Sequence, residues 1–385
     1  MIDRIKVLFV VPSLDLGGAE NLLVATINEL KADHDIYLIV LGTGGSLISQ
    51  IDLQADRILI LGDENLHTIS AKIFISSSLA AFKIKKFLRK KRLNLIVAHL
   101  PIAHLICRLT VILCRFSFMR VRLVNYHHSM DVFRHSSLNA NIFVRFNRLL
   151  SRGTDFRNIC VSMAVAMDIS RYTTLKKKAI VIYNYAEDDR LASNDLKKDQ
   201  GAYWVVIPGR LEAVKGQLYF MKALENFNLK EFNNLNLKFI FVGGGSQHET
   251  IEALATSRGW AHQVQFTGYV THTVMLNYME CADLIVIPSL SEGLGITAIE
   301  ALMLGKLVLA SDTGGLPEII IDRETGVLFE SGNSSELVIL LKRILLRNIS
   351  IDRASQQEYY KKHFTRHNYF SVLKLNLLSF LVTNE

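Results

Sequence analysis

The chain has 385 residues, of which 50% are hydrophobic and 21% charged, a composition that excludes a disordered protein and predicts two domains of ordinary size. No stretch of about 18 residues is both apolar and uncharged, which argues against a membrane-spanning helix; the most apolar candidate, residues 105–119, contains Arg108 and Arg115. The cysteines follow no metal-binding or disulfide spacing, so we expect free thiols in the reducing cytoplasm: Cys107, Cys114, Cys160 and Cys281.

Residues 1–185 alternate short β-branched runs with amphipathic segments, the pattern of a parallel sheet covered by helices. The first run is interrupted by Pro12 and Asp15, so we interpret it as a strand and not as a signal peptide. The motif Asp33-His34-Asp35 has the form of a metal-binding DxD, but it precedes the second strand, and we interpret it as polar side chains on the protein surface. The expected strands are 5–11, 36–41, 57–61, 93–99, 121–126 and 157–162, and the clearest helices are 20–32 and 72–92.

The helix expected over 72–92 lies in the most basic part of the chain. The net charge is +8, but residues 1–185 hold 25 Lys/Arg against 13 Asp/Glu (+12), whereas residues 186–385 hold 19 against 23 (−4). Residues 65–130 contain 12 Lys/Arg and no carboxylate. This mixture of apolar and basic side chains favours an anionic membrane surface as partner. A solvated basic face is the simple alternative, and nucleic acid ranks third because no binding motif for it accompanies the charge. The expected contact residues are Lys83, Lys85, Lys86, Arg89, Lys90, Lys91 and Arg92.

A polar stretch over residues 186–202 has the composition of a linker, and beyond it the alternation of strands and helices begins again. The last segment, 351–385, is helical in pattern, and we expect it to pack back toward the first domain. The strands expected in this half are 204–209, 237–245, 264–268, 283–288 and 306–311. We therefore predict an α/β protein of two doubly wound, Rossmann-like domains, 1–185 and 203–350, facing a central cleft.

Two basic residues follow the strand expected over 204–209. Arg210 comes directly after it, and Lys215 stands five residues later at the start of another helix. Ligands bind at the carboxyl ends of the strands in such sheets, so these two cations could neutralise a diphosphate without a metal ion. A salt bridge to Glu212 is the alternative for either one alone.

Two carboxylates follow the strand expected over 283–288. Glu292 stands beside Gly293 and Gly295, which open a helix, and Glu300 lies further along that helix. Glycines let the backbone approach a ligand, the first-turn N–H groups favour an anion, and carboxylates accept hydrogen bonds from sugar hydroxyls. The alternative is that Glu292 caps the helix and Glu300 is an exposed helical residue.

These stretches together resemble a known family. PGRLEAVKG, FVGGGSQHE, VQFTGYV, ADLIVIPSLSEGLGITAIEALMLGKLVLASDTGGLPEII and TGVLF occur in this order within 203–330, and LDLGGAE (14–20) follows the first strand. The set is similar to the retaining GT-B-fold glycosyltransferases of family 4, whose signature is two glutamates separated by seven residues. The resemblance covers nearly the whole chain and implies transfer of a sugar from a nucleotide-diphosphate donor, with no metal and no other cofactor.

The resemblance implies a role for each of these residues. Arg210 and Lys215 would hold the donor's diphosphate, with Glu300 binding the ribose. Glu292 would contact the transferred sugar. Backbone N–H groups around sugar and phosphates would come from Gly293, Leu294, Gly295, Ile296 and Thr297, and from Gly17 and Gly18 in the first domain. The base would lie near Gly243, Gly244, Tyr269 and Val270.

Three histidines at strand ends are further candidates. The family often places a histidine at the position of His127, facing the donor sugar, and we prefer it to the neighbouring His128 as a catalytic residue; we interpret His99 as structural. Family members often carry phenylalanine at the position of Leu294 and proline at that of Thr297, so these departures bear on which sugar is used.

The resemblance and the basic first half together predict a cytoplasmic enzyme at the inner membrane face. It would glycosylate a polyprenyl-linked glycan in bacterial surface polysaccharide assembly. A nucleotide-sugar epimerase of the same fold and a non-catalytic nucleotide-sugar-binding subunit are the alternatives. A dinucleotide dehydrogenase is disfavoured because neither LGTGGS (41–46) nor GGGS (243–246) makes a GxGxxG with an acidic ribose ligand.

Overall fold

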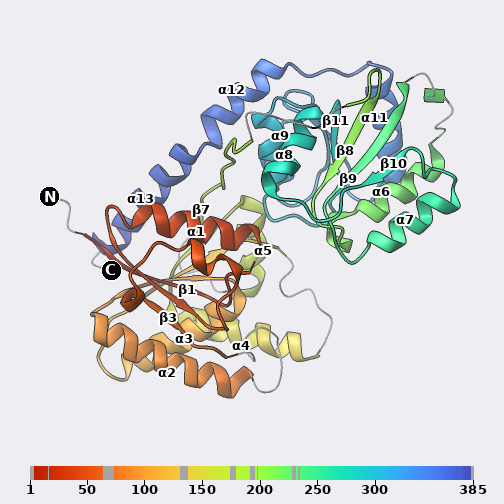
Figure 1. Ribbon diagram of the computed structural model, residues 1–385. Helices are drawn as coiled ribbons and strands as arrows, with labels where there is room; N and C mark the ends of the chain where they lie inside the picture. Colours follow the sequence, from red (N-terminus) through yellow and green to blue (C-terminus); the bar gives the residue numbers. More distant parts are fainter. Residues whose placement is uncertain are drawn as a thin grey trace. The chain divides into compact units, whose positions relative to one another are not determined.

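The computed structural model describes residues 4–15, 17–63, 73–130, 138–173, 179–190, 196, 198–227, 231–232 and 235–382. It divides into two compact units (Figure 1): the first comprises Met1–Ile182 with Phe370–Glu385, and the second comprises Tyr183–Tyr369. Each unit is built around its own parallel sheet.

The sheet of the first unit has seven strands in the order β3-β2-β1-β4-β5-β6-β7. The strands are β1 (Lys6–Val11), β2 (Asp35–Val40), β3 (Ile58–Ile60), β4 (Leu95–His99), β5 (Arg122–His127), β6 (Asp155–Cys160) and β7 (Ile180–Val181). All neighbours are parallel, and the order reverses between β1 and β4. Ligands of doubly wound sheets bind beside such a reversal, at the carboxyl ends of the two strands.

The helices of the first unit lie on both faces of this sheet. They are α1 (Gly18–Leu30), α2 (Ile73–Lys91), α3 (Pro101–Arg115), α4 (Leu138–Thr154) and α5 (Met163–Tyr172). Figure 1 shows α2 and α3 along one face and α1 on the other. Apolar side chains of α2 and α3 form a core with alternate residues of the strands, among them Leu8, Val10 and Leu123. This burial is what gives these helices their stability, since an isolated helix of this length is marginal in water.

The second unit repeats the design with six parallel strands in the order β10-β9-β8-β11-β12-β13. The strands are β8 (Tyr203–Pro208), β9 (Leu237–Val242), β10 (Val264–Phe266), β11 (Leu284–Ile287), β12 (Val308–Ser311) and β13 (Val327–Phe329). The helices are α6 (Gln217–Ala223), α7 (His248–Ser257), α8 (His272–Cys281), α9 (Ile296–Met303), α10 (Leu316–Ile319), α11 (Ser334–Leu345) and α12 (Arg353–His363); α13 (Arg366–Val382) ends the described chain. The order reverses between β8 and β11.

The predicted architecture of two Rossmann-like sheets is confirmed, and every strand expected from the sequence is present. The sequence reasoning missed β13 as a strand because only three residues of TGVLF are extended, too few for a period to be visible. The four cysteines are free thiols, as expected. None of the helices in the described part of the chain is long and apolar enough to cross a bilayer.

The ends of the second unit differ from the expectation. Residues 351–369 belong to the second unit and not to the first, because α12 packs on α9 and Gln356 donates to the carbonyls of Lys306 (2.8 Å) and Thr325 (2.7 Å). Only residues from Phe370 onward join the first unit. The expected linker 186–202 is also bound to the second unit where it is described, since Arg190 pairs with Glu280 at 2.8 Å.

The Asp33-His34-Asp35 motif lies among surface ion pairs. Asp33 pairs with Lys374 at 2.8 Å and Asp35 with Arg57 at 3.3 Å, which agrees with the interpretation as polar surface side chains. His34 differs from the expectation because its side chain is buried.

Candidate active site

The charged residues singled out in the second unit lie at the reversal point of its sheet. The loop 209–216 follows β8 and the loop 288–295 follows β11, and these two strands are neighbours. The loops are joined directly, because the N–H groups of Leu290 and Ser291 donate to the carbonyl of Val214 at 2.8 and 3.2 Å. The sheet therefore brings together two segments that are about 80 positions apart in the sequence.

This junction places Lys215 on Glu292. The Lys215 Nζ lies 2.7 Å from Glu292 Oε2, and the Ser289 hydroxyl donates to the same oxygen at 3.1 Å. The Glu292 side chain is 12% exposed and that of Lys215 28%. Glu212, the alternative partner, is instead bound to the backbone N–H and hydroxyl of Ser246 at 3.1 and 2.7 Å. Glu292 does not cap a helix, because the N-cap of α9 is Gly295.

Close backbone packing holds the start of α9 in place. Gly295 has φ +97°, a left-handed conformation that favours glycine, and it is the N-cap of α9 without a side-chain hydrogen bond. A Cβ on Gly314 would lie 1.7 Å from the Glu292 carbonyl oxygen, so the 313–315 turn sits directly against the loop. Leu294 is buried, which leaves its backbone as the part that could meet a ligand. The N–H groups at this helix start suit an anion.

The loop carrying Arg210 is attached to the glycine run 243–245. The Gly209 N–H donates to the Val242 carbonyl at 2.9 Å, and the Leu211 N–H donates to the Gly244 carbonyl at 3.0 Å. Between these anchors the Arg210 side chain is exposed, and within the described ranges its guanidinium makes no hydrogen bond. A cation whose backbone is anchored and whose guanidinium is exposed is well suited to bind an anion from solution.

The expected base-binding residues form one surface beside Arg210. A Cβ on Gly243 would lie 2.3 Å from the Gly209 carbonyl oxygen, and one on Gly244 would lie 2.6 Å from the Tyr269 ring. Tyr269 is 82% exposed although its ring edge packs on Gly244, and Val270 follows it. Whether a base rests on this surface stays a prediction.

The sequence reasoning missed the partner of Glu300. Glu300 is buried at 3% exposure, not an exposed helical residue, and its Oε1 lies 2.7 Å from His272 Nε2. The other ring nitrogen of His272 lies 3.1 Å from Asp189 Oδ2. The hydrogen bonds to these two carboxylates raise the pKa of His272 to about 9. The sequence did contain a signal for this residue: His272 is the first residue of α8, directly after its N-cap Thr271 and a few residues after the end of β10.

His99, His127 and His128 lie at the carboxyl ends of β4 and β5. His127 Nε2 lies 2.9 Å from Asn158 Oδ1 and its ring packs on His104, whereas His128 stacks on Tyr126 and binds His99 at 2.8 Å. The two neighbours thus point to opposite faces, as strand alternation predicts. Burial lowers the pKa of His127 to about 4 and that of His128 to about 3. The donor-facing role of His127 stays a prediction.

Two further expectations concern the first unit. Gly17 and Gly18 open α1, and the carboxylate of Glu20 folds back so closely that a Cβ on Gly17 would lie 2.2 Å from it. This end of α1 therefore attracts negative charge within the chain itself. His99 is buried as expected, but its Nε2 has no hydrogen-bond partner among the residues that the structure describes, so it is only partly satisfied.

Sequence models of two protein families match adjacent parts of the chain. The first, described as Glycosyltransferase Family 4, matches residues 16–190, and the second, described as Glycosyl transferases group 1, matches residues 188–363. The second match contains Arg210, Lys215, Glu292 and Glu300.

The chain is also similar to curated proteins. An uncharacterized glycosyltransferase of Methanocaldococcus jannaschii is 30% identical over 161 residues, which cover 41% of this chain and 40% of that protein. The chain thus spans less than half the length of that relative. The similarity to GalNAc-alpha-(1->4)-GalNAc-alpha-(1->3)-diNAcBac-PP-undecaprenol alpha-1,4-N-acetyl-D-galactosaminyltransferase of Campylobacter jejuni is longer, 25% identity over 350 residues and 89% of each chain.

Solved structures with the same architecture cover nearly the whole chain. Anabaena HepE in complex with UDP superimposes with a TM-score of 0.75 at 18% identity, covering 97% of this chain and 100% of that one. The lipopolysaccharide outer core galactosyltransferase WaaB superimposes with a TM-score of 0.77 at 14% identity, covering 97% and 99%. These likenesses identify the fold as GT-B.

Proposed function

Because the chain belongs to the group 1 glycosyltransferases of family 4, we propose that it transfers a sugar from a nucleotide-diphosphate donor to an acceptor hydroxyl with retention of configuration. The observation that carries this proposal is the 2.7 Å contact of Lys215 with Glu292 beside the start of α9. A cation, an open helix start and a carboxylate lie together there. This combination suits an anionic diphosphate next to a hydroxyl-rich sugar.

The proposed chemistry consists mainly of stabilising the departing diphosphate. Arg210 and Lys215 would bind its oxygens and offset the negative charge that develops as the glycosidic bond breaks, so the proposal needs no metal ion for this step. Glu292, already fixed by Ser289 and Lys215, would accept hydrogen bonds from the transferred sugar. The acceptor oxygen would bond to the anomeric carbon on the face from which the diphosphate leaves, and its proton would pass to an oxygen of the departing diphosphate, with His127 near the sugar.

We propose UDP as the nucleotide part of the donor. The support is the UDP in the Anabaena HepE complex, whose fold this chain shares over 97% of its length. The exposed Tyr269 ring beside the glycine run offers a flat surface for the base.

The test of this function is a transfer assay. Radiolabelled UDP-sugars would be incubated with bacterial lipid extracts and the wild-type chain, Lys215→Ala, Glu292→Ala and Lys222→Ala. We expect label in the lipid fraction with the wild type and with Lys222→Ala, an exposed lysine of α6. Loss of an oxyanion-type contact costs about 10²–10³ in rate, so Lys215→Ala and Glu292→Ala should lose most of the signal. Conversion of donor without acceptor would indicate an epimerase, and donor binding without turnover a binding subunit.

We further propose that the acceptor is a lipid-linked glycan at the inner membrane face. The name of the Campylobacter jejuni relative includes PP-undecaprenol. The first unit, in addition, exposes apolar side chains among basic ones. The outer side of α2 exposes Leu79 (61%) and Phe82 (62%) among its lysines. Exposed apolar residues within a basic field are typical of proteins that bind anionic bilayers.

A pair of exposed phenylalanines extends this surface. Phe116 and Phe118, in the turn after α3, are 81% and 97% exposed. The Lys85 Nζ of α2 donates to the hydroxyl of Ser117 between them at 2.5 Å, so the turn lies directly beside the basic helix. Phenylalanines this exposed have no role in the core and would enter the headgroup region of a membrane.

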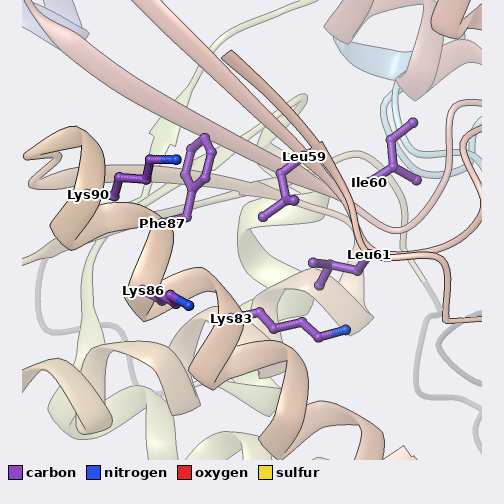
Figure 2. A pocket seen from close by; sticks show the side chains of 7 residues that line it. All are labelled: Leu59, Ile60, Leu61, Lys83, Lys86, Phe87 and Lys90. Carbon is purple, nitrogen blue, oxygen red and sulfur yellow. The ribbon is translucent and has the colours of Figure 1, made fainter. Parts of the chain in front are cut away.

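On its other flank α2 borders a groove of about 300 Å³ against the edge strand β3 (Figure 2). Leu59 of β3 and Leu61, just after it, point toward α2, where Phe87 completes an apolar floor, whereas Ile60 points the other way. Three amines surround this floor: Lys83, Lys86 and Lys90. The arrangement suits an anionic amphiphile, because its acyl chain would contact the apolar floor and its headgroup would contact the amines.

Vesicle flotation tests the membrane proposal. The wild type should float with phosphatidylglycerol vesicles at low salt, be released at high salt, and ignore phosphatidylcholine. Lys83→Gln/Lys86→Gln/Lys90→Gln and Phe118→Ser should each weaken flotation, whereas Lys361→Gln/Lys362→Gln on α12 should not. Equally poor binding to both lipids would refute it without affecting the donor proposal.

A further inference from the structure

Glu300 carries an oxygen that the folded chain leaves unused. Its Oε1 is bound by His272, but its Oε2 is buried and has no hydrogen-bond partner among the residues that the structure describes. A buried carboxylate oxygen without a donor costs free energy, since it has lost its water. The oxygen is therefore ready to accept a hydrogen bond from a ligand hydroxyl.

The orientation of this oxygen depends on a chain of three residues. Asp189, in the segment before β8, lies 3.1 Å from His272 Nδ1, and His272 Nε2 lies 2.7 Å from Glu300 Oε1. The hydroxyl of Thr273 also reaches Asp189, at 3.5 Å. A hydrogen bond to a carboxylate on each side favours the imidazolium form of His272, in which both ring nitrogens carry a proton.

We propose that His272 is a positioning residue for nucleotide binding: held by Asp189, it fixes the rotamer of Glu300 so that Oε2 receives the ribose hydroxyls. This inference rests on the proposed function, in which Glu300 is the ribose ligand. The ring nitrogen of His272 at 2.7 Å holds Oε1 of Glu300 in place, which leaves Oε2 as the oxygen without a protein donor among the described residues. The charged groups that act on His272 are Glu300 of α9 and Asp189.

A purely structural role for His272 is the competing explanation. The histidine joins α8 to α9, and its removal could loosen both helices. That role would weaken every nucleotide equally, because the base and diphosphate sites would suffer with the ribose site. The positioning role instead weakens only the recognition of the ribose hydroxyls.

The experiment compares two probes, UDP and 2′,3′-dideoxy-UDP, by titration calorimetry. A hydrogen bond to a charged group contributes about 1.5–3 kcal/mol, so wild type should prefer UDP by a factor of about 10–100. We expect His272→Gln and Asp189→Asn to reduce this preference at least about fivefold while dideoxy-UDP binds nearly as before. His272→Gln is the matched variant, since a glutamine can donate one hydrogen bond to Glu300 but carries no charge. Circular dichroism confirms that each variant is folded.

A pH series adds a readout that a structural role would not move. The preference of wild type for UDP should fall as the pH rises past 9 and His272 loses its proton, whereas that of His272→Gln should stay flat. Both probes carry the same base and diphosphate, so titration of those groups cancels in the ratio. If His272→Gln and Asp189→Asn both keep the wild-type preference for UDP over dideoxy-UDP, the positioning role of His272 is refuted and the proposed function is unaffected. A wild type that binds neither probe overturns the proposed function and this inference with it.

Discussion

Lys215 and Glu292 share one oxygen-to-nitrogen contact of 2.7 Å, and in the free chain each neutralises the other. A diphosphate would compete with Glu292 for the same amine. Binding of the donor must then weaken or rearrange the ion pair, and the carboxylate becomes available for the sugar at the moment that the phosphates occupy the lysine. The two residues are therefore expected to act in opposite directions on a nucleotide that carries no sugar.

Titration of UDP into single variants tests this opposition. Lys215→Ala should weaken UDP binding by about tenfold or more, because a charge-assisted hydrogen bond is lost and an unpaired carboxylate faces the phosphates. Glu292→Ala should bind UDP at least as tightly as wild type, since it frees the lysine. Equal loss in both variants would mean that the pair serves folding and not the diphosphate.

The pH dependence of stability is a second prediction for single residues. The pKa of His272 is raised from 6.5 to about 9 by its hydrogen bonds to Glu300 and Asp189. Its contribution to folding is therefore complete below pH 6.5 and is lost as the pH rises through 9. Urea unfolding at pH 6, 7.5 and 9.5 should show His272→Gln less stable than wild type at pH 6 and nearly equal at pH 9.5. A gap that widens with pH would contradict the assignment.

Short contacts between elements hold the two site loops of the second unit together. Gly216, the N-cap of α6, has φ +70°, and a Cβ there would lie 1.9 Å from the carbonyl oxygen of Pro288. Gly259 has nearly the same φ, +71°, but a Cβ there would meet nothing within 4 Å. The two glycines separate the effect of backbone conformation from that of close packing.

Alanine at each position should therefore have different costs. Gly259→Ala pays only for the left-handed backbone, about 1–2 kcal/mol. Gly216→Ala must also push the loop after β11 away from Lys215, and we expect at least about 2 kcal/mol more, together with loss of UDP binding. Unfolding curves and calorimetry of the two variants check this. Equal destabilisation would show that the loops can separate freely.

A buried ion pair ties α3 to β6 in the first unit. Arg108 binds Asp155 through two hydrogen bonds of 2.8 and 2.7 Å and also donates to Asn147 at 2.7 Å, and both charged side chains are 2% exposed. From the sequence, Arg108 served only as an argument against a membrane-spanning helix. Its place in the fold explains how an otherwise apolar helix can carry a charge in the core.

Removal of one partner should be costly. Arg108→Met leaves the Asp155 carboxylate buried without its cation, which typically costs about 3–5 kcal/mol. Arg115→Met, on the exposed end of the same helix, should change stability by less than about 0.5 kcal/mol. Urea unfolding followed by circular dichroism measures both. A loss below about 1 kcal/mol for Arg108→Met would show that water or a neighbour satisfies Asp155.

At the scale of the whole molecule, the two units have separate cores and unequal shares of the proposed site. Most of the residues expected to hold the donor lie in Tyr183–Tyr369, and so do both tryptophans, Trp204 and Trp260. Tryptophan fluorescence therefore reports on the second unit alone.

This asymmetry predicts how a nucleotide changes thermal unfolding. A ligand at one hundred times its dissociation constant stabilises its binding unit by about 2.7 kcal/mol. UDP should therefore raise the midpoint of the fluorescence transition, which follows the second unit. Circular dichroism follows both units, and the component of its transition that comes from the first unit should move little. A UDP-induced shift seen only outside the fluorescence signal would place the nucleotide in the first unit.

The sequence by itself determined the local structure and the chemistry available to this protein. Short β-branched runs alternating with amphipathic segments predicted two parallel sheets, and the glycines and glutamates after residues 283–288 predicted a diphosphate-binding helix start. These features are local, because each depends on residues within a few positions of one another. They were sufficient for the fold class, and they singled out Arg210, Lys215, Glu292 and Glu300 as candidate site residues.

Only the tertiary structure decided which distant residues meet. The strand order put β8 beside β11, and so Lys215 on Glu292; the packing of α8 and of the segment before β8 put His272 and Asp189 on Glu300; and the contact of α12 with α9 divided the C-terminal segment between the units. No local pattern encodes such contacts. They follow from how strands pair and helices bury their apolar faces, which involves the whole chain of each unit at once.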